Sequence, residues 1–244
     1  IAIQTFLQQA AVDGLELFMG VVIYCYAFSL FLFGGAHYLF TRRMSDLLYV
    51  KKENEAFGYV LLVCIPILLV SIIIALPAAI FLELSIPNAA LFRFSAILIF
   101  STVNCLWVLM LFVSVLKWYI KILTVYSSGL AASLIFIYIF SKSFGIAGAL
   151  LGFSLGHLLI VLLLALLCRT AWKPAKPSPP PELPLSSGGV IGKSFSYIKK
   201  HRYLFGAGLF FYWGIWIDKM IFWVSSGENI SGTYIRLFFD YDVS

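Results

Sequence analysis

Residues 57–81 read FGYVLLVCIPILLVSIIIALPAAIF, a stretch of twenty-five residues without one charged side chain. A transmembrane α-helix needs about 20 consecutive apolar residues to cross the hydrocarbon core of a bilayer. Lipid offers no hydrogen-bond partner to the backbone, so a segment of this length has to pair its own amides and carbonyls, as an α-helix does. We therefore expect a membrane-spanning helix at these residues.

The same pattern continues along the chain. Its 244 residues are 62% hydrophobic and 11% charged, with a mean hydropathy of +0.99, whereas ordinary soluble domains carry roughly 25% charged residues. This composition excludes a soluble globular protein. Apolar runs long enough to span occur six times, at 15–39, 57–81, 90–116, 120–140, 144–167 and 203–224. We expect an all-α polytopic membrane protein with six transmembrane helices, although the short connections 117–119 and 141–143 leave a merged or re-entrant hairpin open.

Basic residues concentrate on one side of the predicted bundle. The first, third and fifth connections carry thirteen of the 17 Lys and Arg residues, the opposite side carries three, and Lys219 lies inside a span. Because cytoplasmic loops accumulate Lys and Arg, the richer side is predicted to be cytoplasmic and both ends of the chain non-cytoplasmic. The basic residues form no single patch of the kind that binds nucleic acid, so we expect membrane lipid as a neighbour and no nucleic-acid partner.

One connection differs in composition from the others. Residues 171–202 combine six prolines with a Ser-Ser-Gly-Gly stretch, a mixture typical of linkers between units that move or fold separately. We expect three parts: a first helical bundle with five spans at 1–170, a cytoplasmic Pro-rich linker at 171–202, and the start of a second bundle, one span and an outer tail, at 203–244.

The last apolar run contains an adjacent acid and base, Asp218 and Lys219. Each costs about 2.5 to 3.5 kcal/mol at mid-membrane, so such residues usually face a bundle interior or a wet cavity. They point about 100° apart on a helix and need separate partners. We interpret Asp218 as a cavity residue for a cation, a proton or a polar substrate, with Trp216 stacking on a sugar ring or a cationic group. Arg93, in the outer half of its own run, is a possible partner for Asp218 by depth.

Two other interpretations of this run stay open. Lys219 can extend outward to the headgroups while the neighbouring tryptophans anchor the helix at the interface. Asp218 and Lys219 can also form structural ion pairs with a part of the protein outside this sequence.

Further polar and small residues are candidates for a role in transport. Glycines occur at 145, 148, 152 and 156, and from Gly148 onward they have the small-xxx-small spacing that brings helices into backbone contact, so we expect packing rather than a flexible gate. His157 follows them as a proton site or as a hydrogen-bonded packing residue. At the cytoplasmic end of the first run, Arg42 and Asp46 share a helix face and form a membrane anchor, a gate or a docking surface.

No extramembrane segment contains a metal-ligand cluster, a nucleophile elbow or a phosphate-binding glycine loop. The four cysteines lie in or beside apolar runs without the spacing of a zinc site, so they are expected to be small packing residues. We therefore expect no cofactor, no metal and no enzymatic activity.

The stretch GIWIDKMIFW at 214–223, together with TR at 41–42 ahead of DLLY at 46–49, resembles the Pel exopolysaccharide transporter family, PelG. The glycine segment 145–157 also resembles it, whereas Arg43 stands where the family usually has an aromatic residue and FGGAH at 33–37 is a loose match. The resemblance covers nearly the whole chain. PelG proteins in turn resemble the multidrug, oligosaccharidyl-lipid and polysaccharide flippase superfamily, whose members have about twelve helices in two six-helix bundles around a central cavity.

The resemblance implies that the six runs are helices two to seven, that the first helix and the last five are missing from this sequence, and that the linker joins the two bundles. It further implies a multi-pass protein of the bacterial inner membrane that works with a cytosolic glycosyltransferase and other Pel membrane subunits to export an amino-sugar polymer for the biofilm matrix.

Our leading hypothesis is a transporter that moves a polysaccharide or a lipid-linked precursor. We place Asp218, Lys219, Trp216, His157 and Arg93 at its transport cavity, and Arg42 and Asp46 at a cytoplasmic gate or docking surface. The alternative is a non-transporting scaffold subunit of a synthase complex, and a membrane-embedded glycosyltransferase comes third.

Overall fold

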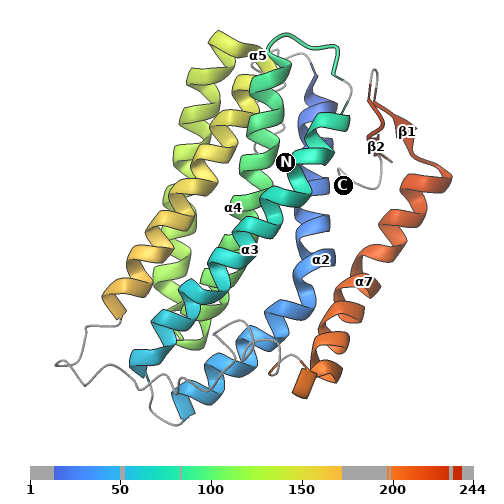
Figure 1. Cartoon of the computed structure of the whole chain (residues 1–244). Helices are drawn as coiled ribbons and strands as arrows, with labels where there is room; N and C mark the ends of the chain where they lie inside the picture. Colours follow the sequence, from blue (N-terminus) through green and yellow to red (C-terminus); the bar gives the residue numbers. More distant parts are fainter. Residues whose placement is uncertain are drawn as a thin grey trace.

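The computed structural model describes residues 14–49, 53–82, 84–171, 197, 199–230 and 233–237. These residues form a helical bundle with a small two-stranded hairpin (Figure 1). The elements are α2 (Leu15–Tyr49), α3 (Glu53–Phe81), α4 (Ala89–Val115), α5 (Tyr119–Ala171), α7 (Arg202–Ser225), β1 (Glu228–Asn229) and β2 (Arg236–Leu237). Strands β1 and β2 pair antiparallel. The all-helical expectation is confirmed for the described part of the chain.

Four of the described helices are long and apolar enough to cross a membrane: Leu15–Leu47, Tyr59–Phe81, Ala89–Val115 and Tyr119–Thr170. The sequence predicted six spans, and the difference lies in α5 and α7. Helix α5 holds two predicted runs in one element, and α7, the run with Asp218 and Lys219, is not among the four. The structure therefore establishes a helical protein with four candidate spans, and the count of six stays a prediction.

Helix α5 is broken at Gly145, whose φ of 58° and ψ of −136° are not helical. Glycine adopts this conformation easily because it has no Cβ. The two arms on either side of the break run side by side in opposite directions (Figure 1). The turn lies two residues beyond the connection predicted at 141–143, so α5 is a hairpin made of the two predicted runs.

Glycines allow the two arms of this hairpin to pack closely against each other. A Cβ on Gly152 would lie 2.5 Å from the backbone nitrogen of Ile137, and one on Gly156 would overlap the hydroxyl group of Ser133. A Cβ on Gly148 would likewise overlap the backbone carbonyl group of Phe140. The packing role predicted for the glycine spacing is confirmed, because the backbones of the arms approach more closely than any side chain allows.

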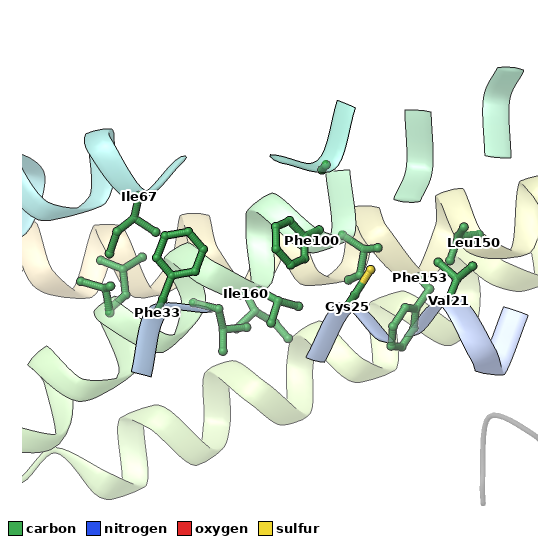
Figure 2. Close-up of a cluster of buried hydrophobic side chains, with 14 of the residues drawn as sticks. Val21, Cys25, Phe33, Ile67, Phe100, Leu150, Phe153 and Ile160 are labelled. Carbon is green, nitrogen blue, oxygen red and sulfur yellow. The ribbon is translucent and has the colours of Figure 1, made fainter. Parts of the chain in front are cut away.

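Helix α4 lies at the centre of the bundle and packs against α2, α3 and α5. Its side chains Phe92, Ile99 and Val103 are completely buried. Figure 2 shows the surrounding cluster, in which Cys25 of α2 and Phe100 of α4 lie near Phe153 of α5. The four cysteines form no disulfide, and three of them are buried, as expected of packing residues.

The helix ends that flank the basic connections lie together at one end of the bundle. One end of the bundle holds the α2–α3 and α4–α5 connections, the end of α5 and the start of α7, whereas the other end holds the α3–α4 connection, the turn of α5 and the β-hairpin (Figure 1). The described helix ends next to the charge-rich connections all lie at the first end, which we call the basic end. Which end is cytoplasmic stays a prediction.

Labelling from outside the cell tests this orientation. Cysteine in place of exposed Lys142 is expected to react with a membrane-impermeant maleimide in intact spheroplasts, whereas cysteine in place of exposed Lys117 is expected to react only after permeabilisation. The unsubstituted protein is the control for the four native cysteines, three of which are buried. Labelling in the opposite order would reverse the predicted topology.

Candidate functional site

Helix α7 lies against α2 through stacked aromatic rings. Trp213 stacks on Phe31 with ring centroids 4.6 Å apart and an interplanar angle of 5°. Its indole Nε1 also donates to the carbonyl oxygen of Phe31 at 3.1 Å. Further along, Trp223 stacks on Tyr24 at 4.4 Å. Offset aromatic pairs of this kind contribute about 0.5–1.5 kcal/mol beyond the area they bury, so the rings fix the register of the two helices.

Small residues let these helices approach between the aromatic pairs. A Cβ on Gly35 would lie 2.7 Å from the carbonyl oxygen of Phe205, and a Cβ on Gly208 would lie 2.7 Å from the ring of Tyr38. A Cβ on Gly34 would likewise overlap the ring of Tyr212. This contact was missed at the level of the sequence, although the pair Gly34-Gly35 opposite Gly208 is a small-residue signal of helix packing in membranes.

The helical period divides the polar part of α7 into two faces. Trp216 and Lys219 follow Tyr212 at the spacing of one helix face, the face that packs toward α2. Asp218 falls instead on another face, with Gly214 and Ile221. Ile221 is 58% exposed, and a Cβ on Gly214 would meet no described atom within 4 Å. Asp218 therefore lies half-buried on a face of α7 that α2 leaves uncovered.

Asp218 and Lys219 are held in different ways. A carboxylate oxygen of Asp218 accepts from the backbone N–H of Lys219 at 2.7 Å. The ammonium group of Lys219 lies 5.9 Å from the ring centre of Trp216, within the range of a cation–π contact. The indole Nε1 of Trp216 is buried without a hydrogen-bond partner among the described residues. Buried donors are normally paired, so this one is available to an oxygen that enters the site.

Arg93 lies at the start of α4, next to the end of α3. Its Nη2 donates to the carbonyl oxygen of Leu82 at 3.0 Å, which ties the α3–α4 connection together. Its Nε is buried and has no hydrogen-bond partner in the part of the chain that the structure describes. The predicted contact with Asp218 on α7 stays a prediction.

His157 belongs to the packed interior of α2, α4 and α5. Its Nδ1 lies 3.0 Å from the carbonyl oxygen of Phe153, and its Nε2 lies 2.6 Å from the hydroxyl of Tyr26. A carbonyl only accepts, so we assign the proton to Nδ1, and the Tyr26 hydroxyl then donates to Nε2. Trp107 Nε1 donates to Ser29 nearby at 3.1 Å. Both ring nitrogens of His157 are thus paired, which favours the packing interpretation over a proton site.

At the basic end, Arg42 and Asp46 form a salt bridge of 3.2 Å, as their spacing predicted. Tyr197 donates to the Asp46 carboxylate at 3.5 Å, and the guanidinium of Arg43 lies 5.4 Å from the Tyr197 ring. Burial raises the pKa of Tyr197, and the negative charge of Asp46 raises it further, so the hydroxyl stays protonated as a donor. Tyr197, which belongs to the predicted linker, is thereby attached to α2.

His37 is a site residue that the sequence analysis did not single out. It is buried at the α2–α7 contact, 6.3 Å from the ring of Tyr212, and its Nε2 has no partner among the described side chains. Its position within FGGAH offered no signal of this, because only the packing of α7 on α2 removes it from water.

Substitutions of two glycines on α7 test the contact with α2. We expect Gly208→Leu to separate the helices, because its side chain would overlap Tyr38, and Gly214→Leu to be tolerated at the open face. The measurement is the cross-linking yield of a short bis-maleimide between cysteines in place of Phe31 and Trp213. Equal yields in the two glycine variants would contradict the observed pairing of α2 with α7.

Comparison with known protein families gives a match over the whole chain. The family model PelG, described as "Putative exopolysaccharide Exporter (EPS-E)", matches residues 1–244, the whole chain. No curated protein and no solved structure matches.

Proposed function

We propose, from the fact that this chain belongs to the PelG family of exopolysaccharide exporters, that it carries a polysaccharide across the bacterial inner membrane in the manner of a flippase. The coarser part of this statement, export of an exopolysaccharide by a helical membrane protein, follows from the family and from the apolar helices. The flippase mechanism, the amino-sugar polymer and the inner membrane are our proposal.

In this proposal the apolar runs are six passes of a two-bundle, twelve-helix fold. Residues 1–170 belong to the first bundle, 203–244 begin the second, and the linker at 171–202, most of which lies outside the described residues, joins them. The contact between α2 and α7 is then a contact between bundles. Stacked rings and glycines hold one face of α7 against α2, whereas a Cβ on Gly214, on the face with Asp218, meets no described atom within 4 Å. A helix beside a transport path would have such a face.

The single observation that carries the proposed role of the site is the position of Asp218 on the uncovered face of α7. A carboxylate there attracts a cationic amino sugar, a proton or a sodium ion, and the low dielectric of the membrane strengthens that attraction. The indole N–H of Trp216, which has no partner among the residues that the structure describes, offers a donor to a sugar oxygen, and its ring offers a stacking surface. Lys219, His157 and Arg93 remain proposed members of the cavity.

A scaffold without transport activity is the second candidate function, and the exposed ion pair at the basic end favours it. Arg42 and Asp46 are 57% and 42% exposed, which suits docking of a cytosolic glycosyltransferase or another Pel subunit. One experiment separates the candidates: polymer secretion and recovery of partners from the same membranes. A transporter loses secretion but keeps its partners in Asp218→Asn, whereas a scaffold loses its partners in the double variant Arg42→Ala/Asp46→Ala and tolerates Asp218→Asn.

A further inference from the structure

A pocket of about 350 Å³ opens between α2, α3 and α4. It lies toward the end of the bundle opposite the basic end, since its walls come from the first half of α2, the last turns of α3, the first turns of α4 and Ile235 beside β2. The lining residues include Phe28 and Leu32 of α2, Ala75 and Ala78 of α3, and Ala96 of α4. The volume falls within the range of small-molecule sites, roughly 300–1,000 Å³.

The walls of this pocket are apolar. Tyr24 lines it, but its hydroxyl donates to the carbonyl oxygen of Arg236 at 2.9 Å. Apolar cavities stay dry and take up apolar molecules, because a water inside would lack hydrogen-bond partners. On the outer side of α3, Ile73 and Ile80 are 68% and 62% exposed, as expected of a helix that faces lipid chains. A hydrocarbon chain is therefore the natural content of the pocket.

A positively charged residue, Arg93, lies next to the residues that line the pocket. Arg93 precedes the lining residue Ala96 by one helical turn and donates from Nη2 to the carbonyl of Leu82, another lining residue. Its Nε is buried without a partner among the described residues, so one N–H of a permanently charged group lacks an acceptor. Buried charges are normally paired, and phosphate oxygens match the planar guanidinium.

These features combine into one site for an amphipathic anion. We propose that the pocket binds an anionic glycerophospholipid, with an acyl chain between α2, α3 and α4 and the headgroup phosphate on Arg93. The apolar walls select the chain, and the unpaired N–H of Arg93 selects the phosphate. Arg93 is itself a proposed cavity residue, so the two sites would share this side chain, but the walls of the pocket include none of the described residues of α7.

The test is native mass spectrometry of the full-length protein, delipidated in detergent and titrated with phosphatidylglycerol or with diacylglycerol of the same chains. We expect wild type to prefer phosphatidylglycerol about tenfold, the ratio that 1.4 kcal/mol produces. Arg93→Gln is expected to lose this preference, and Arg93→Lys to keep part of it. Ala78→Phe is expected to reduce binding of both lipids, because Ala78 lines the pocket and a phenyl ring would occupy its space.

Matched variants separate this site from general lipid binding. Lys142→Gln removes an exposed positive charge at the same end of the bundle, and Ala131→Phe adds a ring on the exposed surface of α5. Both are expected to leave the lipid preference unchanged. Equal losses in Lys142→Gln and Arg93→Gln, or unchanged binding in Ala78→Phe, would overturn the proposal. Each variant is first checked for a monodisperse elution profile, so that misfolding is not counted as lost binding.

Discussion

Cells that carry Asp218→Asn in the full-length protein are expected to secrete less than about a tenth of the wild-type amount of polysaccharide. A hydrogen bond to a charged group contributes roughly 1.5–3 kcal/mol, and the loss of that energy changes an equilibrium about tenfold or more. The amide keeps the shape of the carboxylate but cannot attract a cation. Its insertion into the membrane is easier than that of the acid, so the abundance of the protein is expected to stay the same.

Secretion is measured with an antibody or lectin against the polymer, and protein abundance by immunoblot of the same membranes. Glu228→Gln is the matched control, because it removes an exposed carboxylate from β1 and leaves α7 intact. Asp218→Glu keeps the charge and is expected to retain part of the activity. Normal secretion by Asp218→Asn would make this residue a structural charge, and transport would then need another site.

Much of the fold was predictable because membranes impose a simple rule on sequence. Uncharged runs such as 57–81 mark helices almost to the residue, as α3 shows by ending at Phe81. The same rule failed at the end of α2, which continues ten residues past the apolar run. There Phe40, Met44 and Leu47 are buried at helical spacing while Arg42 is exposed, so the extension is an amphipathic helix that a search for apolar runs does not detect.

Which helices pack against each other could not be predicted from the sequence, for a physical reason. Lipid chains are as apolar as leucine, so hydrophobicity does not say which face of a membrane helix meets which neighbour. The glycines of α5 predicted close packing but not that their partner is the preceding arm of the same element. The contact of α7 with α2 depends on the fit of Gly34, Gly35 and Gly208 to aromatic rings, which only three-dimensional packing shows.

The residues of the candidate site could be predicted from the sequence, but their contacts with one another and with other helices could not. Asp218 and Lys219 stand out in any hydropathy scan, and their divergence by about 100° follows from the helical period alone. The sequence could not tell that the indole N–H of Trp216 has no hydrogen-bond partner in the described part of the chain, or that both nitrogens of His157 are paired. Hydrogen-bond satisfaction depends on neighbours that are distant along the chain, so residue type by itself predicts only a candidate.

Gly152→Leu is expected to prevent the α5 hairpin from closing and to remove most of the folded protein. A Cβ at this position would lie 2.5 Å from backbone atoms of Phe136 and Ile137, and a backbone cannot move aside as a side chain does. Overpacking a core usually costs about 1–3 kcal/mol, and we expect this variant at or above the upper end of that range. Fluorescence-detected size-exclusion chromatography should show the loss of the monodisperse peak.

The same substitution at Gly206 of α7 is the control, because a Cβ there would meet no described atom within 4 Å. Gly206→Leu adds the same side chain to another apolar helix, so it is expected to keep the monodisperse peak and near-normal abundance. Equal profiles for the two variants would contradict the backbone contact between the arms of α5. A partial loss in Gly152→Ala, smaller than in Gly152→Leu, would support it, because the cost of overpacking grows with the volume that is forced between the two backbones.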